Sequence, residues 1–489
     1  QSADGRKSWL LDMAQTNEEA RIPIGRVALD KGTLAYDDPG QKTSLRAELS
    51  TALPVAAANS ANDLRFGVVG RYKGLPLTAQ GSGGPVLALR DTTLPYPLTL
   101  DGSVGQTGVR LRGEVTGLLT LSAVDMRMTL RGDTLEQLYP LLGIAFPATR
   151  SYVTLGHLLR TGNTWRYQDF TGRVGTSDVA GFVQVLTGGK RPTLTADLRS
   201  SLLDLDDLGP LIGARPGSLT VATEAPNTAQ RVLPDLPFKT DRWDTVNADV
   251  QLHAGKLRRN KSLPLDKLEA HLHLLDSVLT LDPLNFSLAG GQLNTKIKLD
   301  GRGQVIQAHA QLRARKLLLA QLLPASASSQ GSIGQINGEF DLRGSGNSVR
   351  QMLAGANGKL GLVVAGGQIS RLMMEKAGLH LWEILSLNLT GDRLVKLRCG
   401  VADFDVKSGV MHTEALVLDT QVTTLIGTGS IDLAQERLDL TFNPKTKNTS
   451  PVALRSPIYV RGSLAQPKVE IDKVRVTARA VGAVVLGAI

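Results

Sequence analysis

Most of the chain consists of short runs in which apolar and polar residues alternate. Clear examples are residues 269–274, 293–300 and 438–442, where every second position is Ala, Leu, Ile, Thr or Phe and the intervening positions are charged or polar. Successive side chains of a β-strand point to opposite faces, so this period of two predicts strands with one apolar and one solvated face. Turns containing Gly, Asp and Asn join the runs, as a series of β-hairpins requires.

The last quarter of the chain, residues 397–472, shows this pattern most densely. Turns at Lys407–Gly409 and Ala434–Glu436 separate its runs, and it contains no helical pattern. The sequence therefore predicts successive antiparallel strands whose apolar face has no helix nearby to cover it. For the whole chain we expect a mainly β fold, a long antiparallel sheet with a few short helices and one longer amphipathic helix.

Four segments break the alternation and predict helices. Asp133 and Glu136 fit the N-cap and capping-box positions of a short helix, and residues 204–211 and 316–323 resemble it. The longest helical pattern runs from about residue 369 to 389 and has one apolar face. We expect this helix to pack on the sheet, the alternative being that it contacts a membrane or plugs a groove.

The chain divides at a proline-rich connection. Residues 215–241 contain four prolines and few apolar residues in register, so we expect an N-terminal part, residues 1–214, and a C-terminal part, residues 242–489. The strand pattern resumes directly after the connection. We therefore expect the two parts to continue one sheet rather than to form independent domains.

Composition narrows the class of protein. The chain has 489 residues, 42% hydrophobic and only 4% aromatic, and a net charge of +10. The densest basic cluster, Lys256–Lys261, has no aromatic residues beside it, so we expect no nucleic-acid partner. A single cysteine, Cys399, excludes an internal disulfide and a zinc site built on cysteines. Because the chain begins with Gln and carries no signal-peptide pattern, we expect a fragment of a longer protein.

No residue pattern indicates catalysis, a metal or a cofactor. His271 and His273 share one strand face but have no third ligand at a useful spacing in the sequence, so we interpret them as solvated side chains. We interpret Cys399 as a buried structural cysteine. The glycine-rich turns lack phosphate-binding spacing, and no nucleophile elbow, Walker or zincin pattern occurs. We expect a protein that is not an enzyme.

The apolar face of such a long sheet must be shielded from water. Two sheets packed as a sandwich would shield it, and this is the commoner arrangement. Residues 196–210 and 310–324 form a weak repeat, in which a strand ends in Leu-Arg and a short helical pattern then closes on Pro. This repeat, the scarcity of aromatic residues and the lack of any catalytic pattern favour a curled trough, whose apolar interior would bind lipid. The residues that alternation predicts to line it are Leu272, Leu274, Leu293, Ile297, Leu299, Leu438, Leu440 and Phe442.

Several segments resemble the AsmA family of bacterial envelope proteins. The resemblance rests on the order of many short matches, chief among them residues 164–170, 203–211, 366–370, 399–409, 427–440, 454–458 and 462–467. It implies a protein held in the inner membrane by an N-terminal helix, which is missing here, with its bulk in the periplasm. It also implies a taco-shaped groove like that of bridge-like lipid carriers, and no catalytic residues.

Together, the pattern and the resemblance predict a non-enzymatic periplasmic protein that carries phospholipid acyl chains in its groove between the inner and outer membranes, supporting outer-membrane assembly. The alternative is a periplasmic scaffold or regulator of outer-membrane protein targeting, with envelope proteins as partners and no lipid conduit. An enzyme acting on envelope glycans is the least favoured, because no paired acids occur in a loop.

Overall fold

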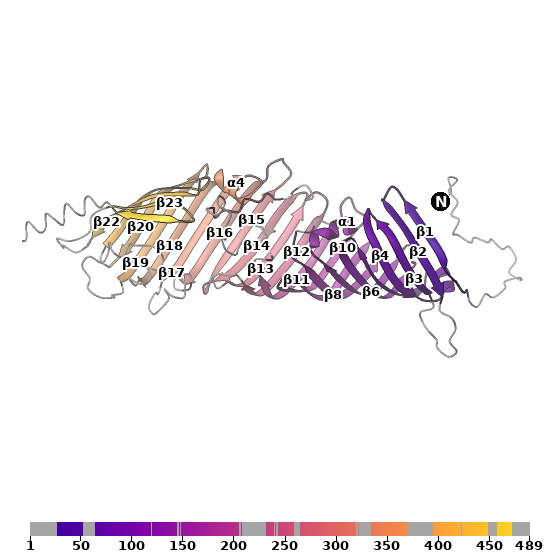
Figure 1. The fold of residues 1–489 in the computed structure, drawn as a ribbon. Coiled ribbons are helices and arrows are strands. Elements are labelled where there is room, and N and C mark those ends of the chain that lie inside the picture. Colours follow the sequence, from indigo (N-terminus) through magenta and orange to yellow (C-terminus); the bar gives the residue numbers. More distant parts are fainter. Residues whose placement is uncertain are drawn as a thin grey trace, which may run out of the picture.

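In a computed structural model, the chain is described over residues 27–51, 64–118, 120–143, 146, 148–204, 207, 231–238, 240, 243–258, 265–318, 321, 334–369, 395–421, 423–447 and 457–471. These residues form a single 24-stranded sheet, in which each strand pairs with the next one along the chain. The sheet is elongated, curled and unclosed, and runs from β1 at one end to the C-terminal strands at the other (Figure 1). The predicted fold class is confirmed.

The N-terminal strands are β1 Gly32–Asp38, β2 Thr43–Thr51, β3 Leu64–Tyr72, β4 Leu75–Gly83, β5 Pro95–Val104, β6 Thr107–Thr116, β7 Ala123–Gly132, β8 Tyr152–Thr161, β9 Thr164–Val174, β10 Ser177–Leu186 and β11 Thr193–Asp204. The remaining strands are β12 Asn247–Arg258, β13 Leu265–Leu275, β14 Val278–Leu288, β15 Gly291–Asp300, β16 Gln307–Leu318, β17 Gln335–Ser345, β18 Asn357–Ile369, β19 Val395–Lys407, β20 Val410–Thr420, β21 Thr423–Asp432, β22 Arg437–Thr446, β23 Ile458–Ser463 and β24 Pro467–Ile471.

One pairing departs from the hairpin pattern: β11 and β12 are parallel, with Thr193 beside Asn247 and Asp204 beside Arg258. Two parallel strands need a crossover connection, which returns the chain to the end at which the first strand began. The proline-rich connection has this role, because it leaves after β11 and re-enters at β12. The two parts of the chain thus share one hydrogen-bonded sheet, while the proposed division into 1–214, 215–241 and 242–489 stays a prediction.

The apolar face is continuous from strand to strand. Directly paired residues of neighbouring strands point to the same face. One cross-strand row, called here the central row, can be followed through the register from β2 to β23 and contains no charged residue. It comprises Thr51, Leu64, Gly83, Leu98, Gly113, Met126, Leu158, Tyr167, Val183, Ala196, Val250, Leu272, Leu281, Ile297, Ala310, Leu342, Gly358, Val406, Met411, Ile431, Leu438 and Gly462.

Three β-bulges keep this face apolar where strict alternation would fail. Asp169, Lys267 and Lys316 each have a positive φ, between 47° and 55°, at or beside a shift in register. An extra residue at a bulge changes the phase of the alternation. In β9, Tyr167 and Phe170 are three residues apart yet stack with ring centroids 5.1 Å apart.

The helices within the described residues are short. After β7, the 3₁₀ helix η3 (Leu135–Leu138) leads into α1 (Tyr139–Leu142); η2 is Val86–Arg90, and α4 (Val349–Ala354) precedes β18. The expected N-cap Asp133 is wrong: the hydroxyl of Thr134 accepts the hydrogen bond from the Glu136 amide. The helix expected at 369–389 lies outside the described residues beyond Ile369, which ends β18. Residues 316–318 and 204 are strand, and most of the two short helices expected there lie outside the described residues.

Candidate functional site: an apolar groove

The apolar side chains bury one another although no second sheet covers them within the described residues. Clusters of residues that are less than one-tenth exposed recur along the sheet, for example around Val124 and Met126, around Leu194 and Ala248, and around Phe404. Side chains on a convex face splay apart, whereas those on a concave face converge. Mutual burial on the apolar side therefore indicates that the sheet curls toward this side and forms an apolar groove.

All eight residues predicted to line the groove lie on this face. Leu272, Ile297 and Leu438 belong to the central row itself. The others occupy parallel rows on the same side: Leu274 pairs with Leu279, Leu293 with Phe286, Leu299 with Leu279, Leu440 with Gly429 and Phe442 with Gly427. Leu274, Leu299 and Leu440 are 8%, 7% and 8% exposed, and the other five are half-buried. Their contact with lipid stays a prediction.

Apolar residues from the connecting segments pack on the groove near the parallel pair of strands β11 and β12, called here the parallel junction. Phe146, from the segment between β7 and β8, and Trp243, which lies between the proline-rich connection and β12, both pack against the cluster of Leu194, Val246, Ala248 and Leu274. Phe238 and Trp243 pack against Leu299, Ile306 and Met352. Sequence analysis missed these residues, because they stand outside any strand pattern. For Phe238, the available signal was an isolated aromatic residue within the proline-rich connection.

The described part of the connection before β12 follows a row of turns at one end of the strands. The amide of Val232 donates to Oε2 of the buried Glu436, in the turn between β21 and β22, at 2.6 Å. The carboxylate of Asp235 accepts bonds from the Ser348 hydroxyl and from Arg350, at the start of α4. These contacts hold the connection along one rim of the groove, from β22 back toward β12 (Figure 1).

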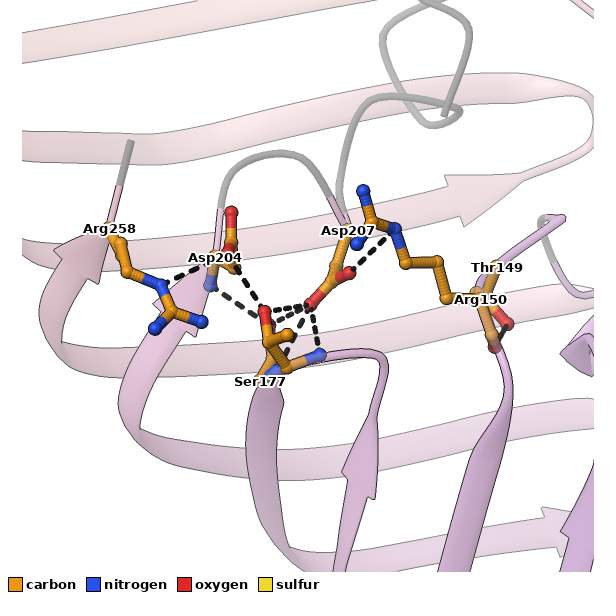
Figure 2. A network of polar contacts seen from close by, with 7 residues as sticks. Thr149, Arg150, Ser177, Asp204, Asp207 and Arg258 are labelled. Carbon is orange, nitrogen blue, oxygen red and sulfur yellow. Dashed lines mark hydrogen bonds and ion pairs between the residues drawn. The ribbon is translucent and has the colours of Figure 1, made fainter. Parts of the chain in front are cut away.

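A buried polar network fixes the other end of the parallel junction (Figure 2). Oδ2 of Asp207, which is 5% exposed, accepts bonds from the amides of Thr176 and Ser177 at 3.0 Å each and from the Ser177 hydroxyl at 2.7 Å. The guanidinium of Arg150 lies 3.4 Å from Oδ1. Asp204 accepts from Thr176 and from Nε of Arg258 at 3.1 Å. The donors come from the segment before β8, from the turn between β9 and β10 with the start of β10, and from the end of β12, so the network holds these strand ends together.

The opposite face is polar and solvated. His271 and His273, expected to be solvated, approach Asp249 of the neighbouring strand at 3.0 and 3.4 Å. This carboxylate was absent from the sequence argument because only strand pairing brings it near. Cys399 is exposed on the polar face, so its interpretation as a buried structural residue is wrong. Across the described ranges, no group of three or more His, Cys, Asp or Glu residues could hold a metal ion.

Comparisons with known proteins give one consistent result. The profile of the AsmA family matches residues 11–416. The AsmA family protein YhjG of Escherichia coli (strain K12) is 34% identical over 502 aligned residues, which cover 95% of this chain and 73% of that protein. No solved structure is significantly similar to the chain. Among the helices that the structure describes, none is both long and apolar enough to cross a membrane.

Proposed function

Because the chain belongs to the AsmA family, whose members are envelope-associated, we propose that its apolar groove binds phospholipid acyl chains and carries lipid between the inner and outer membranes. The protein would act from the periplasm, anchored to the inner membrane by a segment preceding this sequence. AsmA family members are not known as enzymes, and we identify no candidate catalytic group among the groove residues that the structure describes.

The observation that carries this proposal is the unbroken central row. Its members from β2 to β23 carry no charge, and neighbouring strands lie about 4.8 Å apart, so the row offers a path of roughly 100 Å. Each methylene removed from water contributes about 0.8 kcal/mol without any specific polar contact. A row of similar apolar positions lets a chain shift by one strand with little change in binding free energy, which is what transport along a groove requires.

The groove proposal is tested by photo-crosslinking from single sites in cells. A photoreactive amino acid at Leu440, on the apolar face, is expected to capture phospholipid, whereas the same residue at Asp439, one position along β22 and on the polar face, is expected to capture little. Native mass spectrometry of the purified chain should show bound phospholipid. Equal labelling at both positions, together with lipid-free protein, would contradict the groove proposal and favour the alternative, a scaffold or regulator of outer-membrane protein assembly.

A further inference from the structure

Two hollows lie on the polar face of the sheet, away from the groove. The first has a volume of about 440 Å³ and spans β3 to β6; the second has about 430 Å³ and spans β15 to β18. Their lining includes residues two positions apart on one strand, such as Gln80 and Ser82 in the first and Lys298 and Asp300 in the second, which point to the polar face by the register. Each hollow is therefore a depression in the solvated surface.

Cationic side chains line both hollows. In the first, one cross-strand row reads Arg65, Ser82, Thr99 and Arg112, so two hydroxyl groups lie between two guanidinium groups. The two hydroxyl oxygens are 2.8 Å apart. In the second, Lys298, His309, Arg343 and Asn357 follow one another along a single row.

The acids near these rows are already engaged. Asp101 in the first hollow forms an ion pair with Arg110 at 2.6 Å, and Asp300 in the second forms one with Arg302. Asp341 accepts from His309 at 2.8 Å and from Gln311 at 2.6 Å.

Within the described part of the chain, Arg65, Arg112, Lys298 and Arg343 take part in no ion pair. All four are exposed or half-buried. Each hollow is thus lined by two cations that form no ion pair among the described residues, beside hydroxyl or amide groups.

We propose that each hollow binds a phosphate group. Two cations that converge on a small, polar hollow suit a compact anion with several acceptor oxygens, because bonds from charged donors to phosphate are about twice as strong as neutral ones. Arg65 and Arg112 lie three strand spacings apart, about 14 Å between backbones, so their side chains can reach a shared ligand above Ser82 and Thr99. The hollows lie about twelve strands apart, which makes them two separate sites.

The proposal is tested by calorimetric titration of inorganic phosphate into the purified chain at low ionic strength. The wild type is expected to bind two phosphates. R65Q/R112Q and K298Q/R343Q should each bind one, with the affinity of the altered hollow reduced about tenfold or more, and the fourfold variant none. The matched control is R46Q/R173Q, which removes the same charge from two exposed polar-face arginines outside both hollows and should bind as the wild type does.

A second measurement separates the sources of the phosphate group. If lipid headgroups are the ligand, phosphatidylglycerol vesicles but not phosphatidylcholine vesicles should sediment with the protein, and the hollow variants should lose this binding. If free phosphate is the ligand, calorimetry alone responds to the substitutions. Binding of neither probe, or an equal loss in R46Q/R173Q, would overturn the proposal. The groove proposal does not depend on this result, because its lining residues lie on the opposite face.

Discussion

Charge placed in the groove should block the movement of lipid. Leu293 and Ile297 lie on the same strand and face the groove, between Phe286 and Leu281 of β14 and two alanines of β16. We consider Leu293→Asp combined with Ile297→Asp. Both positions are half-buried, so the carboxylates keep access to water and the sheet can still form. Ionised, they would hold water in a section of the groove that is otherwise apolar.

The size of the effect follows from the strand spacing. An acyl chain that crosses β15 along a row passes about four methylenes over a strand spacing of about 4.8 Å. Keeping those methylenes in contact with water costs about 0.8 kcal/mol each, about 3 kcal/mol in total. If this adds to the barrier for passage, the transfer rate falls about 100-fold.

The assay is transfer of a fluorescent phospholipid between donor and acceptor vesicles. The matched control is Gln292→Asp combined with Asn294→Asp, which adds two carboxylates to exposed positions of the same strand and should leave the rate within about twofold of the wild type, because neither residue faces the groove. Circular dichroism checks that both variants fold. A folded groove variant that transfers lipid at the wild-type rate would refute the reasoning, and so would an equal loss in the control.

Three further predictions concern the stability of the sheet, measured as the free energy of unfolding or the midpoint of thermal unfolding. Gly175→Ala should destabilise by about 1–3 kcal/mol more than Gly162→Ala, because both glycines have φ near +60° but only at Gly175 would a Cβ lie 2.1 Å from the Asp207 carboxylate; equal losses would contradict this. Asp207→Asn should cost about 2–3 kcal/mol, since a buried acceptor of three hydrogen bonds loses its charge, and a loss below about 0.5 kcal/mol would contradict the clamp. Although partial burial opposes ionisation, hydrogen bonds from the segment 200–202 hold the pKa of Asp178 at about 2, below its value near 3.9 in an unfolded chain. Its stabilising contribution, about 1 kcal/mol after solvent screening, is present above about pH 4 and is lost as the pH falls toward 2; Asp178→Asn should flatten that part of the pH dependence, and an unchanged slope would contradict the assignment.

Local patterns were sufficient to predict strands and, where the alternation is uninterrupted, the face that each residue presents. Residues 293–300 alternate without interruption, and they form a strand whose odd-numbered residues face the groove. The bulges could not be placed from sequence. At Lys267, two leucines three residues apart, Leu265 and Leu268, pack in the same cluster, whereas alternation assigns them to opposite faces. Nothing about a lysine between an aspartate and a leucine indicates a positive φ, because the shift in register against β14 becomes apparent only when the strands pair.

Contacts between segments far apart in the chain could not be predicted from the sequence either. Glu436 was identified only as part of a turn, yet its carboxylate binds the amide of Val232, about 200 positions earlier. Asp204 and Asp207 fall within residues 204–211, for which the sequence predicted a short helix. Their carboxylates instead accept hydrogen bonds from the turn between β9 and β10, because the sheet brings this turn beside the end of β11. Such partners are set by the three-dimensional arrangement, which alternation along a strand does not encode.

At the parallel junction, the apolar face continues from β11 to β12 although these two strands are not joined by a hairpin. In a hairpin the turn length sets the register, but β11 and β12 have no hairpin between them. A slip of one residue would turn Val250 outward and Asp249 into the groove, since the side chains alternate. It would also separate Arg258 from Asp204, which lie beside each other in the observed register. Burying Asp249 without a partner costs far more than the register change gains. The apolar pattern itself therefore fixes the register, and the crossover lengthens the groove without interrupting it, as carriage of lipid along its whole length requires.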